Sequence, residues 1–283
     1  MINGLLAVYL TLLLVVGLVI LSRLYGLNLF GQLLVKENPA VAVSFAGFAF
    51  GLAFALTGLF FGHMSPDWIP SLYSWGLEGL LALCLVILTV GITDRLLLPR
   101  FPIAKEIADD QNTGVACVIA GVCVSAGLVI NGSLCGYSAS IPAAIRDIVM
   151  YWGLAQIAIW ITLRVIILVR PFDFVRQLEE DDNLASGLSL GFFVISLGLL
   201  GRAAVIHSGQ MSVWTDFGSS CFRWLLGLVV LLGLLSLLKL LLRRRGVSLI
   251  DLELANCHAP VVMWGAIQIT LAMIISLLLQ RPK

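Results

Sequence analysis

Charged residues are scarce in this chain, and their scarcity excludes a water-soluble fold. Only 12% of the 283 residues are charged, whereas 60% are hydrophobic and the mean hydropathy is +1.05. A soluble domain carries roughly 25% charged residues on average. Most of this chain's surface must therefore face a solvent other than water, and the hydrocarbon core of a lipid bilayer is that solvent.

The sequence also lacks the residue patterns on which catalysis, metal binding and nucleic-acid binding depend. We find no glycine-rich phosphate loop, no serine or cysteine nucleophile with a matched base, and no pair of catalytic carboxylates. The six cysteines have no metal-ligand spacing, and the net charge of +1 includes no long basic arm. We therefore predict no enzyme activity, no cofactor, no metal site and no nucleic-acid partner.

Long apolar runs, by contrast, are abundant. A transmembrane helix needs about 20 mostly apolar residues, because the hydrocarbon core is roughly 30 Å thick. The runs are continuous, which favours helices over a barrel whose strands alternate with period two. Eight runs are long enough, and they cover residues 4–24, 39–62, 73–93, 113–135, 146–169, 184–206, 219–242 and 258–280. The sequence therefore predicts an all-α integral membrane protein with about eight transmembrane helices.

Arg and Lys are distributed unevenly between the two ends of these helices. Twelve of the 17 lie at the joints that follow odd-numbered helices, and the other five lie at the opposite end. The positive-inside rule places the basic end in the cytoplasm and both termini on the outer side of the membrane. Cys135 and Cys221 both fall near the outer end, so a disulfide between them is one of the open pairings.

One helical hairpin is repeated four times along the chain. Each basic-end joint contains acids, then an asparagine, then a helix that begins with small residues. These asparagines recur at nearly even intervals, and they are Asn38, Asn112, Asn183 and Asn256. Because each copy crosses the membrane twice, all copies point the same way and form parallel repeats. Two neighbouring copies make one half, which predicts two membrane halves, residues 1–140 and 141–283.

The joint motif has two interpretations. An asparagine side chain can accept hydrogen bonds from free amides at a helix start, and acids there meet the positive end of the helix dipole. Alternatively, the acids form a ring that attracts cations at a cytoplasmic mouth. We favour the helix-cap interpretation, although the two are compatible. Besides the four asparagines, the candidate joint residues are Glu37, Asp109, Asp110, Glu180, Asp181, Asp182 and Glu253.

Small residues are concentrated in the even-numbered helices, which we therefore place at the centre of the bundle. Glycine, alanine and serine let membrane helices approach closely, and lipid supplies little other drive for helices to associate. Close packing is the favoured interpretation of this pattern. A narrow pore lined by helix backbones is the alternative.

Four polar residues occur at similar heights near the outer end. Asn131 and Arg202 follow their joint asparagines by the same interval, whereas Glu78 and Arg223 precede theirs by nearly equal intervals. In the favoured interpretation the two arginines reach toward lipid headgroups and Glu78 pairs with one of them. In the alternative, the four residues form a gate or a ligand site, because buried charges in membranes are usually functional.

The joints also carry a resemblance to a known family. An acid-rich joint, an asparagine, small residues and a glycine-bearing helix follow one another in ITDRLLLPRFPIAKEIADDQNTGVACVIAGVCVSAGLVI and again in VRPFDFVRQLEEDDNLASGLSLGFFVISLGLL. This pattern resembles the bacterial family called domain of unknown function 350, in two tandem copies. The resemblance implies a bacterial inner-membrane protein without an established activity, from a family whose genes occur beside polyamine-type synthetases and envelope-stress components. In that membrane the outer end of the helices and both termini face the periplasm.

Two functions remain open from the sequence. The first is a scaffold or sensor in envelope stress, which recruits cytoplasmic proteins through residues 95–112 and 170–183. The second is a channel or transporter for small cations or polyamines. The middle segments of the even-numbered helices, such as residues 48–56 and 122–130, are almost entirely apolar, which argues against a permanently hydrated pore. We favour the scaffold, and expect it to form a homo-oligomer or to join a membrane complex.

Overall fold

The computed structural model is mostly helical and contains no strand in the residues it describes, which are 2–61, 68–98, 100, 102–136, 140–170, 172–206 and 212–280. Eight of its helices are long and apolar enough to cross a membrane. They are α1 (Ile2–Leu24), α2 (Pro39–Thr57), α3 (Trp68–Ile92), α5 (Thr113–Leu134), α6 (Ile141–Val169), α8 (Leu184–Val205), α9 (Val213–Arg244) and α11 (His258–Leu279). The predicted all-α multi-pass membrane protein is thereby confirmed.

Four of these helices, α1, α3, α6 and α9, begin earlier than their apolar runs, and α6 and α9 show why. α6 starts at Ile141 and α9 at Val213, because Ser140 and Ser212 cap them by accepting from the backbone N–H groups of Ala143 and Thr215. A helix continues through polar residues as long as its backbone hydrogen bonds are made, so an apolar run marks the membrane-embedded part and not the helix. The first turns of α6 and α9 lie outside the predicted runs for this reason.

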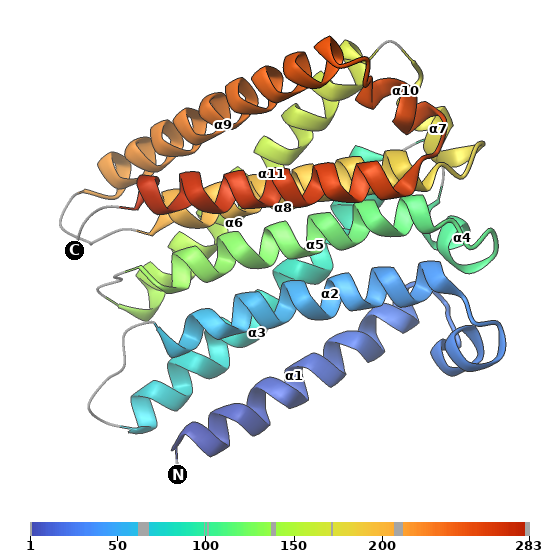
Figure 1. Ribbon diagram of the computed structural model, residues 1–283. Helices are drawn as coiled ribbons and strands as arrows, with labels where there is room; N and C mark the ends of the chain where they lie inside the picture. The colour runs from blue at the N-terminus through green and yellow to red at the C-terminus, as the bar shows by residue number, and fades with distance from the viewer. Residues whose placement is uncertain are drawn as a thin grey trace.

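The second, fourth, sixth and eighth membrane helices, which are α2, α5, α8 and α11, form one continuous layer. α5 packs between α2 and α8, and α8 packs in turn against α11 (Figure 1). α2 and α11 lie at opposite edges of this row, so the four copies form an open layer and not a closed ring. The start of α1 and the end of α11 lie at the same end of the helices (Figure 1).

Glycines set the close spacing within the layer. The backbones of Gly51 on α2 and Gly127 on α5 touch, and a Cβ atom added to Gly127 would collide with the Gly51 carbonyl. Gly121 on α5 meets Gly191 on α8 in the same manner. Small residues thus bring the helix backbones into direct contact, which is the close packing that the sequence favours.

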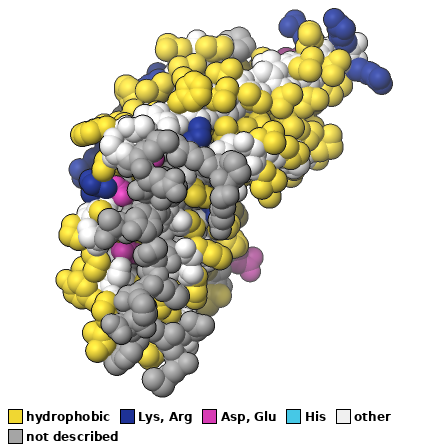
Figure 2. All heavy atoms as spheres, turned by 90° about the vertical axis from the view of Figure 1, so that its left-hand side faces the viewer, with side chains coloured by type: hydrophobic (Ala, Val, Ile, Leu, Met, Phe, Trp, Pro, Cys, Tyr) yellow, Lys and Arg dark blue, Asp and Glu magenta, His cyan; other side chains and the backbone are white. Residues whose placement is uncertain are grey.

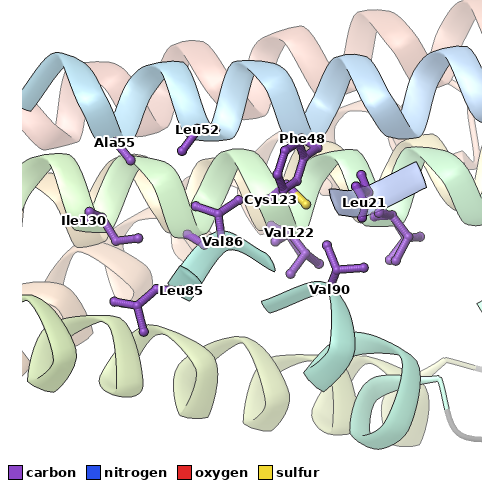
Figure 3. Close-up of a cluster of buried hydrophobic side chains, with 14 of the residues drawn as sticks. Leu21, Phe48, Leu52, Ala55, Leu85, Val86, Val90, Val122, Cys123 and Ile130 are labelled. Carbon is purple, nitrogen blue, oxygen red and sulfur yellow. The ribbon is translucent and has the colours of Figure 1, made fainter. Parts of the chain in front are cut away.

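The remaining membrane helices cover this layer and bury an apolar core. Leu21 of α1, Phe48 of α2, Val86 of α3 and Val122 of α5 meet in one cluster (Figure 3). A second cluster joins α6, α8, α9 and α11 around the Trp264 side chain. Hydrophobic side chains also cover much of the molecular surface (Figure 2), as a bilayer environment requires.

Each of the four joints at the basic end of the membrane helices contains a short helical segment that was not predicted from the sequence. These segments are the π-helical turn η1 (Gly31–Val35) and the helices α4 (Ile103–Ala108), α7 (Phe174–Glu179) and α10 (Leu249–Leu254). Elsewhere, η2 (Gly58–Phe60) and η3 (Thr93–Leu97) extend the ends of α2 and α3. The three short α-helices gather at the end of the molecule opposite the start of α1 (Figure 1).

Candidate functional site

Three of the four joint asparagines cap a layer helix. Asn38 Oδ1 accepts hydrogen bonds from the backbone N–H groups of Ala40 (2.9 Å) and Val41 (3.1 Å) at the start of α2. Asn112 and Asn183 accept from the N–H groups three residues ahead, at 3.0 and 2.9 Å. All three asparagines are buried, so each supplies an acceptor that water cannot supply there.

The amide nitrogen of the same side chains reaches the next copy. Asn38 Nδ2 donates to the Ile107 carbonyl (2.9 Å) at the end of α4. Asn112 donates to the Leu178 carbonyl (2.5 Å) in α7, and Asn183 to the Glu253 carbonyl (3.0 Å) in α10. Each asparagine therefore caps its own helix and ties it to the short helix of the following copy. The sequence indicated the cap but not this second contact.

A polar residue six positions before each asparagine completes the network. Gln32, Glu106 and Gln177 each accept a hydrogen bond through a side-chain oxygen from the amide nitrogen of Asn38, Asn112 and Asn183, respectively. Burial raises the pKa of Glu106, and its hydrogen bond from Asn112 acts in the opposite direction. The recurring Gln or Glu at this spacing is a signal in the sequence from which this network could have been predicted.

The cap predicted at Asn256 is wrong. Asn256 has a backbone φ of +51°, and the residue that holds the N-cap position of α11 is Cys257, which makes no side-chain cap hydrogen bond. The corresponding joint residues Glu37, Gln111 and Asp182 also have positive φ. Asparagine tolerates this left-handed region better than most residues, which explains its place here.

When Cys257 and not Asn256 is taken as the equivalent of the three capping asparagines, the sequences of the two halves align. The interval from Asn38 to Asn183 then equals the interval from Asn112 to Cys257. Asn256 keeps a role between copies, because its Oδ1 accepts from the backbone N–H of Ala185 on α8 (3.0 Å).

The acids of the joints lie in a row at one end of the layer helices. Because the layer is open, they do not form a closed ring. Asp109 and Asp110 follow α4, where Lys105 Nζ lies 3.5 Å from Asp110. Asp181 accepts from Gln177 Nε2 at 2.5 Å. Burial, together with the charges of Asp110 and Asp181, raises the pKa of Asp182. Acids of the second and third joints are therefore close enough to repel one another.

The structure joins two of the four residues of the predicted periplasmic-end layer. Arg202 Nε donates to Asn131 Oδ1 at 2.6 Å, and Asn131 Nδ2 donates to Thr57 Oγ1 at 3.1 Å. Thr57, Asn131 and Arg202 belong to α2, α5 and α8, and each stands at the same interval after the asparagine that caps its helix. This chain of hydrogen bonds connects three copies across the layer.

Glu78 and Arg223, the other two residues of that layer, have polar partners on their own helices. Glu78 accepts from Ser74 one turn away (2.6 Å) and makes no ion pair within the described residues, so its predicted pairing with an arginine is wrong. Arg223 donates to the Ser219 carbonyl and to Ser220 Oγ on α9. Each of the two residues thus has a polar contact within its own helix.

Two ion pairs near the joint end of the molecule were not predicted from the sequence. The Arg170 guanidinium pairs with the buried Glu253 carboxylate and lies 4.5 Å from the Phe174 ring centroid. Asp173, the N-cap of α7, pairs with Arg100 at 3.0 Å, and that hydrogen bond holds the pKa of Asp173 below its usual range. The spacing of these residues in the sequence gave no sign of either pair.

Cys135 and Cys221 are both free thiols in this structure, as are the other four cysteines. Cys135 Sγ contacts Asn131 Oδ1 at 3.6 Å. Groups of three or more His, Cys, Asp or Glu side chains suited to a metal ion do not occur in the described part of the chain.

Comparison with known proteins gives a family and no closer relative. No curated protein and no solved structure matches the chain. The model of one protein family matches it twice, over residues 2–134 and 139–279. The first matched segment holds the hairpins that end in α2 and α5, and the second holds those that end in α8 and α11. The chain therefore belongs to the family described as Domain of Unknown Function (DUF350), of which it holds two tandem copies.

Proposed function

We propose that this protein is a scaffold or sensor in the bacterial inner membrane and has no catalytic activity of its own. The observation that carries the proposal is the tight layer of α2, α5, α8 and α11. Contacts such as Gly51 with Gly127 and Gly121 with Gly191 hold neighbouring backbones together and leave no width for water between them. Because the row is open, it encloses no axis along which ions would pass.

In this proposal the joints face the cytoplasm and recruit a protein partner. Twelve of the 17 Lys and Arg residues support that orientation. α4 and α7 present charged, exposed side chains such as Lys105 and Arg176, and the Arg100–Asp173 ion pair links the two joints into one surface. Rigid elements that display charges of both signs suit the recognition of a soluble protein. The sensing role and its envelope-stress setting rest on the gene context that the family resemblance implies.

Site-specific photo-cross-linking in living cells tests this proposal. The same photoreactive amino acid replaces Arg176 on α7 or, as a matched control, Arg146 on α6 at the opposite end of the membrane helices. We expect a discrete adduct with a soluble protein from position 176 and none from position 146. Equal adduct patterns from both positions, or none from position 176, would contradict the scaffold.

A channel or transporter for small cations or polyamines is the second candidate. The observation that favours it is the group of acids at the second and third joints, where burial and the charges of Asp110 and Asp181 raise the pKa of Asp182. Such a group attracts cations to the joint end. The two candidates differ in whether the protein passes ions across a membrane.

A further inference from the structure

A cavity lies at the joint end of the second half, among α6, α8, α9, α10 and α11. Its volume is about 330 Å³, within the range of small-molecule sites. Most of the wall is apolar and includes Ile166, Leu190, Phe193, Leu235 and Val261. A hydrocarbon chain can pack against this apolar lining.

Three charged side chains also line the cavity, and they leave a net positive charge. Arg170 pairs with Glu253, and its Nη2 donates to Ser189 Oγ at 3.3 Å. Lys239 Nζ lies 5.8 Å from the Trp264 ring centroid and makes no ion pair within 4.0 Å of any described acid. Arg170 thus neutralises the Glu253 carboxylate, and the ammonium of Lys239 is left to bind an anion.

A fourth polar group supports a bound ligand. Gln268 of α11 lines the same cavity and is only 4% exposed, yet its Oε1 has no hydrogen-bond partner within the described residues. A buried amide oxygen without a partner costs free energy, and native structures contain few of them. A ligand whose polar head carries a hydroxyl donor beside its anionic group would remove that cost.

The fold itself does not require these charges. In the register of the helix caps, the equivalent residues of the first half are Tyr25 in place of Arg170, Asp94 in place of Lys239, and Cys123 in place of Gln268. Tyr25 packs edge-on against Phe45, with ring centroids 6.3 Å apart, and Asp94 accepts from the backbone N–H of Ile103 at 2.9 Å. The first half therefore uses the same positions for packing and local hydrogen bonding, and only the second half places two cations and an amide there.

We propose that this cavity binds an anionic amphiphile, a molecule with a phosphate or carboxylate head and a hydrocarbon chain. Lys239, assisted by Arg170, holds the head, and the apolar wall between α6 and α9 holds the chain. Basic pockets between membrane helices on the cytoplasmic side are suited to such headgroups. The excess of positive charge excludes a polyamine as the ligand of this cavity. The site does not depend on whether the joints recruit a protein.

Native mass spectrometry of the purified full chain in neutral detergent tests the proposal. The probes are phosphatidylglycerol, oleate, phosphatidylcholine and inorganic phosphate. We expect saturable retention of phosphatidylglycerol or oleate, and about tenfold weaker retention in Lys239→Gln, because one charge-assisted contact is lost. The matched control Lys36→Gln removes the same charge from the joint of the first half and should bind like the wild type.

A second variant separates shape from charge. Ser236→Phe on α9 fills the cavity and keeps every charge, so it should also lose the amphiphile while its melting temperature shows that it is folded. Three results would overturn the proposal: no saturable binding, equal losses in Lys239→Gln and Lys36→Gln, or inorganic phosphate bound as tightly as the amphiphiles. Retention of oleate alone or of phosphatidylglycerol alone supports it and identifies which head, carboxylate or phosphate, the site prefers.

Discussion

At the scale of single residues, one amide group performs two tasks in each of three joints. The oxygen of Asn112 caps α5, while its nitrogen donates to the Leu178 carbonyl of the next copy. A serine or an aspartate could act as the cap, but neither has the NH₂ group for the second contact. This pair of contacts explains why asparagine stands at all three of these cap positions.

Asn112→Ala should therefore destabilise the protein more than the loss of an ordinary cap. A cap contributes about 1 kcal/mol, and a buried carbonyl left without its donor costs about 1–3 kcal/mol more. We expect a total loss of about 2–4 kcal/mol, measured by unfolding in mixed micelles. The control is Asn28→Ala, which removes an exposed acceptor from the Gly31 N–H and should cost less than about 1 kcal/mol. Equal losses in the two variants would refute the double role.

The fourth joint offers the converse experiment. Cys257 holds the N-cap position with φ of −82° and ψ of 101°, near the values of Asn183, but its side chain makes no cap hydrogen bond. Cys257→Asn should therefore stabilise the protein by about 1 kcal/mol, measured by the same unfolding in mixed micelles. Cys257→Ser, whose hydroxyl oxygen can accept the same cap hydrogen bond, should give a gain of the same sign. A loss of stability in both variants would show that the register assigned to this joint is incorrect.

At the scale of helices, backbone contact between glycines defines the layer. Gly127→Ala places a methyl group where the Gly51 carbonyl stands, so α2 and α5 must move apart. We expect a loss of about 2–3 kcal/mol in the free energy of unfolding. Gly153→Ala on α6 is the matched control, since a Cβ there meets no other atom within 4 Å. It should be neutral or slightly stabilising, because alanine favours helix.

The sequence predicted the long helices but not the details of the joints. Apolar runs and the Asn38, Asn112 and Asn183 pattern sufficed for eight helices, because length in a bilayer leaves few alternatives. The short helices α4, α7 and α10 have only six residues each, too few for a periodic pattern. The N-cap of α11 lies one position after Asn256 because the backbone φ of Asn256 is positive. The spacing of the asparagines in the sequence does not reveal that angle.

The same limit applies to the candidate sites. Equal spacing from the caps brought Asn131 and Arg202 together correctly, since equivalent positions in adjacent parallel helices lie at one height. It did not predict the partner of Glu78, which depends on the direction of its side chain. In the cavity, Arg170 at the end of α6 pairs with Glu253 on α10. These two residues are 83 positions apart in the sequence, so no local pattern connects them.

At the scale of the whole molecule, four parallel hairpins form an open layer with unequal halves. α5 and α8 are mostly buried in its centre, whereas α1 and α9 expose many large hydrophobic side chains. The two halves share a frame, but the positions that bring Arg170, Lys239 and Gln268 together in the second half hold Tyr25, Asp94 and Cys123 in the first. A duplicated fold thus keeps its packing in both copies while one copy is free to acquire a ligand site.

Flux into liposomes that contain the purified full chain tests the central claim, a sealed layer without an ion path, most directly. The account predicts no protein-dependent uptake of potassium or of spermidine over a range of membrane potentials and pH. The Asp109→Asn, Asp110→Asn double variant should behave like the wild type. Protein-dependent flux that falls in that variant would contradict the account and establish the acids of the joint as the mouth of a channel.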